Sequence, residues 1–188
     1  MALVLITVNT TKAGGPDRIL NWVLRDYAYE LAYPVSTIFN SSLAGGILPD
    51  VWKCANVTPI PKVSKVEDIK KDLRPISLIP TLSKIAEDFV VQDHVKPAIL
   101  SNLGSDQFGC IPGSSTTHAL ITMIHNWAKE TDGLTNDVRV FVLDYKKAFD
   151  LVDHSLLMNT LSDYDINPYI INWIGDFLSN RLQRVKYS

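Results

Sequence analysis

The chain has 188 residues, of which 46% are hydrophobic and 20% charged, and its formal net charge is -2. This composition excludes a disordered chain, and the length suits one domain or one and a half. Basic residues outnumber acidic ones between residues 53 and 75, and such a patch is compatible with nucleic-acid binding without arguing for it.

Neither disulfides nor a membrane anchor are expected. Cys54 and Cys110 lie far apart without a close-spaced partner, so no disulfide partner is implied and an intracellular, reducing compartment is expected. The apolar run at the N-terminus extends only from Ala2 to Ile6, whereas a membrane-spanning helix needs about 20 residues.

Two helices are expected first along the chain. The glycine pair before Pro16 predicts a helix that begins there, with an apolar stripe from Ile19 to Leu31. Pro34 is expected to interrupt this helix, and a second one is expected to end at Gly45 and Gly46.

Extended segments come next. The stretch "WKCANVTPIPK" predicts a strand, which Pro59 and Pro61 confine to a sheet edge or a strand end. The charged stretch after it predicts an exposed loop, and "RPISLIP" predicts another extended segment. Thr81 or Ser83 is expected to cap the helix that follows.

The C-terminal half predicts a helix over "HALITMIHNWAKET" and then the clearest strand, because Val138 to Leu143 are almost continuously apolar, as in a sheet covered on both faces. Asn167 and Pro168 predict the cap and first turn of a further helix. The final stretch "RLQRVKYS" predicts the beginning of a strand. This order of elements predicts an α+β fold.

The stretch "FVLDYKKAFDLVDH" places Asp144, Asp150 and Asp153 at and after the end of the apolar strand. In phosphoryl transfer, two Mg2+ ions held by carboxylates clamp the attacking and the leaving oxygen. Spacing alone leaves two readings of Asp144, a metal ligand or a turn carboxylate, whereas the other two aspartates more often orient groups within a turn.

The same stretch resembles the first catalytic motif of reverse transcriptases from non-LTR, LINE-like (jockey-like) retrotransposons. Further stretches resemble successive blocks of this family in the same order: "KAGGPDRI", "IFNSSLAGGILPDVWKCANVTPIPK", "LRPISLIPTLSKIAED", "DQFGCIPGSSTTHAL" and "INWIGDFLSNRLQRVKYS". The resemblance covers residues 12–188 and leaves residues 1–11 unassigned. It implies the fingers and the first part of the palm of a right-hand polymerase, truncated at the C-terminus.

Carried over to this sequence, the resemblance makes Asp144 the first catalytic, metal-binding aspartate and the carbonyl of Tyr145 a second ligand of Mg2+ (or Mn2+). Phe149 falls where the family keeps an aromatic ring that excludes a ribose 2′-hydroxyl. The backbone N–H groups around Lys147 and Ala148 are expected to face the triphosphate.

Lys62 and Arg74 match the lysine and arginine of the fingers that hold the phosphates of the incoming nucleotide in related enzymes. The long loop between them leaves open whether Lys62 or Lys65 contacts phosphate. Many relatives carry an aromatic residue and an arginine where this chain has Cys110 and Ile111, which puts a template or primer contact there in doubt. Cys110 is expected to pack as a small apolar group.

The implied function is RNA-directed DNA polymerisation, a nucleotidyl transfer whose partners are an RNA template, a DNA primer and dNTP. The family's second aspartate motif does not occur in these 188 residues, so the chain alone is expected to be inactive and to need its metal only as part of the complete domain. By family analogy its location is cytoplasmic and nuclear. A non-catalytic RNA-binding module and an unstable relic of a mobile element stay open as alternatives.

Overall fold

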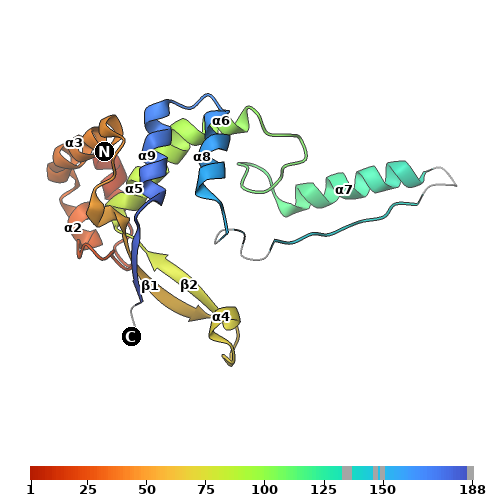
Figure 1. The fold of residues 1–188 in the computed structure, drawn as a ribbon, viewed down its shortest axis with the longest axis horizontal. Coiled ribbons are helices and arrows are strands. Elements are labelled where there is room, and N and C mark those ends of the chain that lie inside the picture. Colours follow the sequence, from red (N-terminus) through yellow and green to blue (C-terminus); the bar gives the residue numbers. More distant parts are fainter. Residues whose placement is uncertain (133–136, 146–147, 149–150, 186–188) are drawn as a thin grey trace. The chain divides into compact units, whose positions relative to one another are not determined.

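The computed structural model describes residues 1–132, 137–145, 148 and 151–185. It divides into two compact units: Met1–Val95 with His154–Ser188, which we call the sheet unit, and Lys96–Asp153, which we call the α7 unit. In chain order the elements are α1 (Ala2–Ile6), α2 (Asn21–Asp26), α3 (Ala28–Gly45), the 3₁₀ turn η1 (Asp50–Lys53), β1 (Cys54–Pro61), α4 (Ile69–Asp72), β2 (Leu73–Leu78), α5 (Thr81–Val90), the π-helical η2 (Val91–Val95), α6 (Lys96–Leu100), α7 (Thr116–Thr131), α8 (His154–Ser162), α9 (Pro168–Leu178) and β3 (Leu182–Val185) (Figure 1).

The sheet unit is built around a sheet with strand order β2-β1-β3. β1 pairs antiparallel with β2 from Asn56 to Pro61, and parallel with β3 from Cys54 to Val57. β1 is therefore central at its start, which excludes the predicted edge position. Pro59 lies in the second half of β1, where β2 is the partner, so the alternative of a strand end is the correct one.

The first predicted helix begins later than expected. α2 starts at Asn21 rather than at Pro16, and Leu20 of the expected apolar stripe is 54% exposed. Arg18 has a φ of 62°, which breaks helical geometry before α2. The Asn21 side-chain amide donates to the carbonyls of Asn9 and Lys12 and so ties the N-terminal segment to the start of α2.

The expected interruption at Pro34 was also wrong, because α3 continues through this residue to Gly45. The break lies instead at Tyr27, between α2 and α3. A proline inside a helix removes one hydrogen bond, and buried residues on both sides of it, Ala28 and Val35, supply packing that offsets this loss. The helix ends as predicted, with Gly46 in the left-handed conformation.

Neither residue predicted to cap α5 does so, since the N-cap position is Pro80 and carries no side-chain cap. The Thr81 hydroxyl instead donates to Oδ1 of Asn21, and the buried Ser83 hydroxyl donates to the carbonyl of Trp52. Both side chains thus connect α5 to other elements. The helices over α7 and α9 and the strands β1, β2 and β3 are confirmed.

The strand predicted from Val138 to Leu143 does not form. Residues 137–145 adopt neither helix nor strand, and Phe141, Val142 and Leu143 are 84%, 88% and 85% exposed. A strand needs a neighbour to bond its backbone, and the described part of the chain supplies none to this segment.

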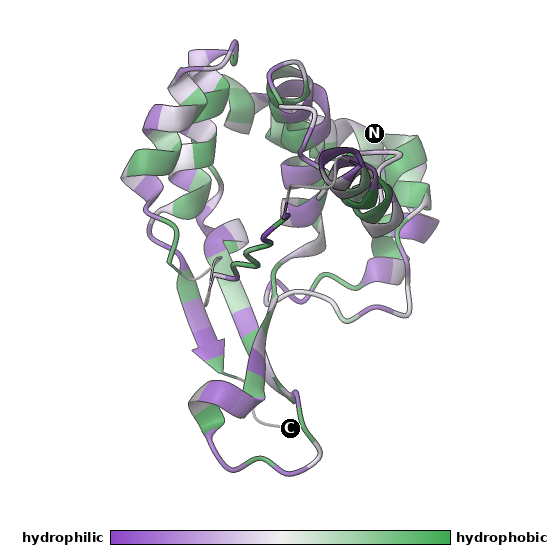
Figure 2. Cartoon of the chain, turned by 90° about the vertical axis from the view of Figure 1, so that its right-hand side faces the viewer, coloured by the Kyte–Doolittle hydropathy of each residue, from purple (hydrophilic) through white to green (hydrophobic). Residues whose placement is uncertain are grey.

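The core of the sheet unit forms where α9 packs on α3. Trp173 of α9 is buried and its indole N–H donates to the Ser42 hydroxyl of α3 at 2.9 Å. Phe39 of α3 meets Trp52 of η1 edge to face. In Figure 2, hydrophobic residues alternate with hydrophilic ones along the helices, as one-sided packing requires.

An ion pair crosses this core. Lys53 is 6% exposed, and its Nζ donates to Oδ1 of Asp176 at 2.7 Å, while Oδ2 of Asp176 accepts from the Leu48 N–H. Burial alone would raise the pKa of Asp176, but the hydrogen bonds from Lys53 and Leu48 and the Lys53 charge together lower it. The pair joins η1, which leads into β1, to α9, which leads into β3.

The described parts of the chain contain no helix with the length and apolarity that crossing a bilayer requires.

Replacing Gly15 by alanine should destabilise the chain by about 1–3 kcal/mol, the usual cost of overpacking. A Cβ at Gly15 would lie 2.3 Å from the backbone Cα of Pro80, which leads into α5. Urea unfolding followed by circular dichroism measures the effect. Gly45→Ala is the matched control, because a Cβ at Gly45 meets nothing within 4 Å. Equal stability of the two variants would contradict this packing.

Asp176→Asn should lower the free energy of unfolding by about 3 kcal/mol, because Lys53 then keeps a buried charge without its anion. The exposed pair of Arg25 and Asp26 is the control, and Asp26→Asn should cost less than about 1 kcal/mol. Chemical unfolding of both variants near neutral pH makes the comparison.

The stability effect of Asp176→Asn should also depend on pH. The pKa of Asp176 is lower in the folded chain than its ordinary value of 3.8. The ionised carboxylate therefore stabilises the fold fully above pH 3.8, and this stabilisation is lost as the pH falls through the pKa of the folded state. As the pH falls below 3.8, the stability difference between wild type and Asp176→Asn should therefore shrink. A constant difference would show that the carboxylate charge does not stabilise the fold.

Candidate nucleotide-binding hairpin and metal carboxylate

Two of the predicted phosphate-binding residues lie on one hairpin. β1 and β2 pair with Ile60 opposite Arg74, and the Lys62 N–H donates to the carbonyl of Asp72 at 2.7 Å, which extends the pairing by one step. Side chains at alternate positions share a face, so Lys62 and Arg74 are diagonal neighbours on the same face, about 7–8 Å apart. The fold thus brings together two cations separated by a charged loop in the sequence.

Both side chains are exposed, and the described residues form no salt bridge with either. The Lys62 ammonium donates to the carbonyl of Lys71 at 2.9 Å, which holds it beside the hairpin. Lys65, the alternative phosphate contact, lies in the loop and pairs with Glu67 at 3.2 Å. Because an exposed pair of this kind is weak, position distinguishes the two lysines: Lys62 shares the hairpin face with Arg74, and Lys65 lies in the loop.

Asp72 closes the loop between the two strands and was not identified from the sequence. Its carboxylate accepts from the backbone N–H groups of Asp68 and Glu67, at 2.9 Å and 3.0 Å. These bonds, and the nearby Lys62 charge, lower the pKa of Asp72. An aspartate directly before a strand is a typical turn residue, and this position in the sequence could have identified Asp72.

The predicted metal carboxylate follows the exposed apolar segment of the α7 unit. Asp144 and Tyr145 are exposed, and Ala148 is an exposed turn residue. Lys147 and Phe149 lie outside the described residues.

A carboxylate and a backbone carbonyl are the oxygen ligands that Mg2+ takes, so the donor chemistry of residues 144–145 fits this ion. The described ranges contain no cluster of three or more His, Cys, Asp or Glu side chains that could hold a metal ion. The predicted metal carboxylate, Asp144, belongs to the α7 unit, whereas the hairpin cations belong to the sheet unit.

The loop before α7 keeps a defined shape. Ser115 caps α7 by accepting from the backbone N–H of His118, and Gly113 has a φ of 76°. Cys110 is exposed, with a φ of 61°, so the prediction that it packs as a small apolar group was wrong. Its left-handed backbone turns the loop and leaves the thiol outside.

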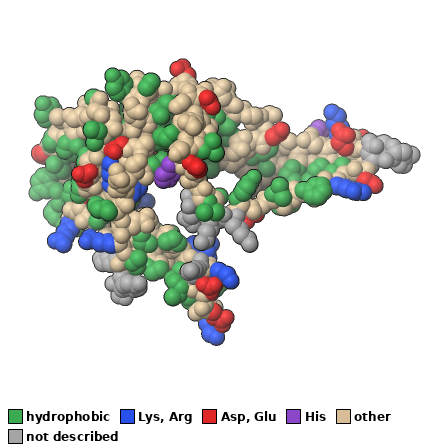
Figure 3. All heavy atoms as spheres, in the orientation of Figure 1, with side chains coloured by type: hydrophobic (Ala, Val, Ile, Leu, Met, Phe, Trp, Pro, Cys, Tyr) green, Lys and Arg blue, Asp and Glu red, His purple; other side chains and the backbone are tan. Residues whose placement is uncertain are grey.

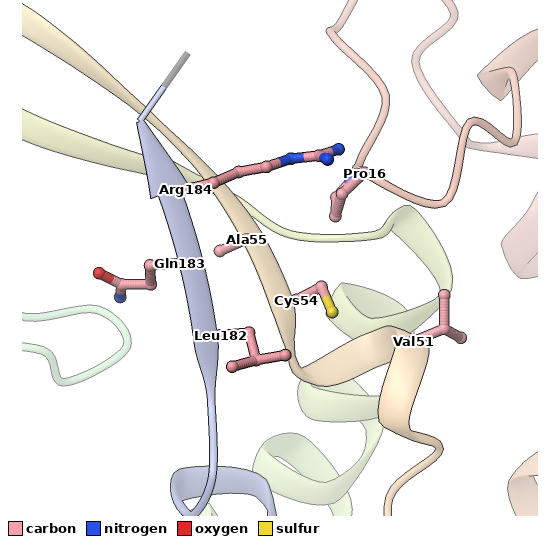
Figure 4. Close-up of a pocket in the computed structure, with 7 residues that line it drawn as sticks. All are labelled: Pro16, Val51, Cys54, Ala55, Leu182, Gln183 and Arg184. Atoms are coloured by element: carbon pink, nitrogen blue, oxygen red, sulfur yellow. The ribbon is translucent and has the colours of Figure 1, made fainter.

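A pocket of about 300 Å³ opens beside the start of β1 and β3 (Figure 4). Pro16, Cys54, Leu182 and Arg184 contribute to its lining, and the residues predicted to bind nucleotide or metal do not. Nε of Arg184 donates to Oδ1 of Asn56, so this guanidinium connects β3 to β1. The pocket is thus separate from the hairpin face that carries Lys62 and Arg74.

Comparison with known proteins identifies relatives of this chain. A family model described as reverse transcriptase (RNA-dependent DNA polymerase) matches residues 60–188. The chain is 28% identical over 188 residues to the probable RNA-directed DNA polymerase from transposon X-element of Drosophila melanogaster, which covers 100% of this chain and 20% of that protein.

It is 29% identical over 148 residues to the RNA-directed DNA polymerase from mobile element jockey of Drosophila melanogaster, covering 78% of this chain and 16% of the relative. It is also 29% identical over 139 residues to the transposon TX1 uncharacterized 149 kDa protein of Xenopus laevis, covering 73% of this chain and 10% of that protein. The chain therefore spans a fifth or less of the length of these relatives.

Proposed function

Because the chain belongs to the reverse transcriptase (RNA-dependent DNA polymerase) family, we propose that it forms the nucleotide-gripping part of a retrotransposon polymerase that copies RNA into DNA. The observation that carries this proposal is the position of Lys62 and Arg74 on one face of the β1–β2 hairpin. Both residues were assigned from different sequence blocks, and the fold makes them neighbours.

The family uses a divalent metal together with a nucleic-acid template and primer. For this chain we assign Mg2+ (or Mn2+), an RNA template, a DNA primer and dNTP. The primer 3′-hydroxyl attacks the α-phosphate of the nucleotide, the bond to the β-phosphate breaks and pyrophosphate leaves. Family membership favours RNA-directed DNA polymerisation over a non-catalytic RNA-binding role.

In this proposal Arg74 and Lys62 bind the triphosphate. The planar guanidinium presents paired N–H donors that match two phosphate oxygens, and the ammonium adds a compact charge. Together they offset the negative charge of the leaving pyrophosphate. Their exposure leaves them accessible to a nucleotide, and the hydrogen bond from Lys62 to Lys71 positions the ammonium before binding.

Asp144 and the Tyr145 carbonyl are proposed to hold a metal ion. The bound ion would polarise the phosphate and favour ionisation of the attacking hydroxyl. The proposed roles of Lys147 and Ala148 toward the triphosphate, and of Phe149 against a ribose, rest on the family resemblance.

Binding of dTTP to the purified chain tests the hairpin. Arg74→Ala and Lys62→Ala should each weaken the affinity about 10-fold, because each removes a charge-assisted hydrogen bond. Arg74→Lys should retain only part of the affinity, since an ammonium group cannot reproduce the paired N–H donors of the guanidinium. Isothermal titration calorimetry measures these affinities.

Lys65→Ala is the matched control and should bind within about 2-fold of wild type, because exposed ion pairs such as that of Lys65 with Glu67 contribute little. If Lys65→Ala weakens binding as much as Lys62→Ala does, the loop rather than the hairpin face holds the phosphates.

Metal binding at Asp144 is tested by substituting Fe2+ for Mg2+ and adding ascorbate and peroxide, which cleave the backbone beside the bound ion. Cleavage should occur near residue 144 in the wild-type chain and disappear in Asp144→Asn, because the amide lacks the negative charge that attracts the ion. Asp153→Asn, a carboxylate assigned to the following turn, should be cleaved like wild type. Loss of cleavage in Asp153→Asn alone would contradict the assignment.

A further inference from the structure

The loop between β1 and β2 ends in a single helical turn, α4, and one carboxylate holds this turn together. Oδ2 of Asp72 accepts from the backbone N–H groups of Glu67 and Asp68, at 3.0 Å and 2.9 Å, and the Asp72 N–H donates to the Asp68 carbonyl at 2.7 Å. A helix of one turn is unstable on its own in water. The order of α4 therefore depends on the local bonds that Asp72 makes.

The carbonyl end of this turn holds Lys62. The Lys62 N–H donates to the Asp72 carbonyl at 2.7 Å, and the Lys62 ammonium donates to the Lys71 carbonyl at 2.9 Å. Carbonyls in the last turn of a helix have no partner within the helix, and a lysine side chain is a suitable donor to them. Two successive carbonyls of α4 thus fix both the backbone and the charged end of Lys62.

Arg74 is held in a different way. It lies within β2, opposite Ile60 of β1, so strand pairing fixes its backbone independently of the loop. Lys62 instead follows Pro61, the last residue of β1. The position of Lys62 therefore depends on the loop, whereas that of Arg74 depends on the sheet.

Fixing Lys62 before a nucleotide binds increases the affinity, because a lysine side chain loses more rotamer freedom than most when it is immobilised. An ammonium group has three N–H donors, and Lys62 gives one of them to Lys71, so the others remain available to phosphate oxygens. An arrangement that is formed in advance reduces the entropy lost on binding. The α4 turn thus prepares Lys62 to bind phosphate together with Arg74.

We infer that Asp72 is a positioning residue for nucleotide binding: by folding the α4 turn, it places the carbonyls that hold Lys62 on the hairpin face shared with Arg74. This inference rests on the proposed function, because it takes Lys62 and Arg74 as the residues that bind the triphosphate. Asp72 acts through Lys62 and does not itself bind the nucleotide.

The charge of Asp72 alone would have the opposite effect. Figure 3 shows basic and acidic side chains gathered at the tip of the hairpin. Hydrogen bonds from the N–H groups of Asp68 and Glu67, together with the Lys62 charge, lower the pKa of Asp72, so this group is an anion at neutral pH. An anion here repels a triphosphate. Removal of Asp72 therefore strengthens nucleotide binding if only its charge matters, and weakens it if the turn positions Lys62.

The affinity of the purified chain for dTTP, measured by isothermal titration calorimetry, tests the inference. Asp72→Ala should weaken binding about 5-fold, because Lys62 then becomes ordered only on binding. Asp72→Asn keeps a neutral acceptor and should lose less affinity. Glu67→Gln is the charge control, because it removes an anion from the same loop whose side chain pairs with Lys65. This variant should bind dTTP at least as tightly as wild type.

A double-mutant cycle tests whether Asp72 acts through Lys62. In a Lys62→Ala background, Asp72→Ala should change the affinity by less than about 2-fold, because the side chain that it positions is absent. In an Arg74→Ala background, Asp72→Ala should again weaken binding about 5-fold. Equal effects of Asp72→Ala in the two backgrounds would overturn the inference.

Amide hydrogen exchange, followed by NMR without nucleotide, measures the order of the turn. The Glu67 and Asp68 amides should exchange about 10-fold faster in Asp72→Ala than in wild type, because both lose their acceptor. The Leu48 amide, which donates to Asp176, is the internal control and should exchange at the same rate in both proteins. Unchanged exchange at Glu67 and Asp68 would overturn the inference.

These measurements separate the inference from the function on which it rests. If Lys62→Ala and Arg74→Ala both leave the affinity for dTTP unchanged, the proposed nucleotide-binding role fails and the inference fails with it. If these two variants weaken binding while Asp72→Ala binds dTTP as tightly as wild type or more tightly, only the inference fails.

Discussion

The pair of Lys53 and Asp176 holds together two parts of the sheet unit that the chain connects only through the other unit. One oxygen of Asp176 accepts from the Lys53 ammonium and the other from the Leu48 N–H. One turn earlier on α9, Trp173 donates to Ser42 of α3. α9 is thereby fixed against α3 and η1, and β3, which follows α9, reaches β1 in parallel register. The sheet depends on this junction because a strand without a neighbour leaves its backbone unpaired.

The position of the phosphate-binding candidates follows from the same junction. η1 ends at Lys53 and β1 begins at the next residue. The Lys53–Asp176 pair therefore helps to set which side chains of β1 lie on each face of the sheet. A slip of one residue between β1 and β2 would turn Lys62 and Arg74 to opposite faces. The bonds that Asp72 accepts at the far end of the hairpin fix the loop and oppose such a slip. Strand register, rather than the length of the loop, therefore makes these two cations neighbours.

Some features governed by local backbone chemistry could be predicted from the sequence. Asn167 caps α9 by accepting from the Tyr169 N–H, and the strands before and after the charged loop form where alternation and β-branched residues placed them. Contacts distant in sequence could not be predicted in this way. Lys53 stood out only as part of the basic stretch from residue 53 to 75, and a hydrogen bond to a residue 123 positions away makes its burial favourable. Pro34 was misjudged for a similar reason, since packing of α3 offsets its missing hydrogen bond.

The apolar stretch before Asp144 shows a further limit, because hydrophobicity indicates that a segment needs cover without specifying which surface provides it. A strand that paired with residues 138–143 would satisfy their backbone and cover their side chains, while Asp144 at the end of the segment would stay accessible to a metal ion. Cover for the apolar residues and access for the carboxylate are therefore compatible demands on one segment.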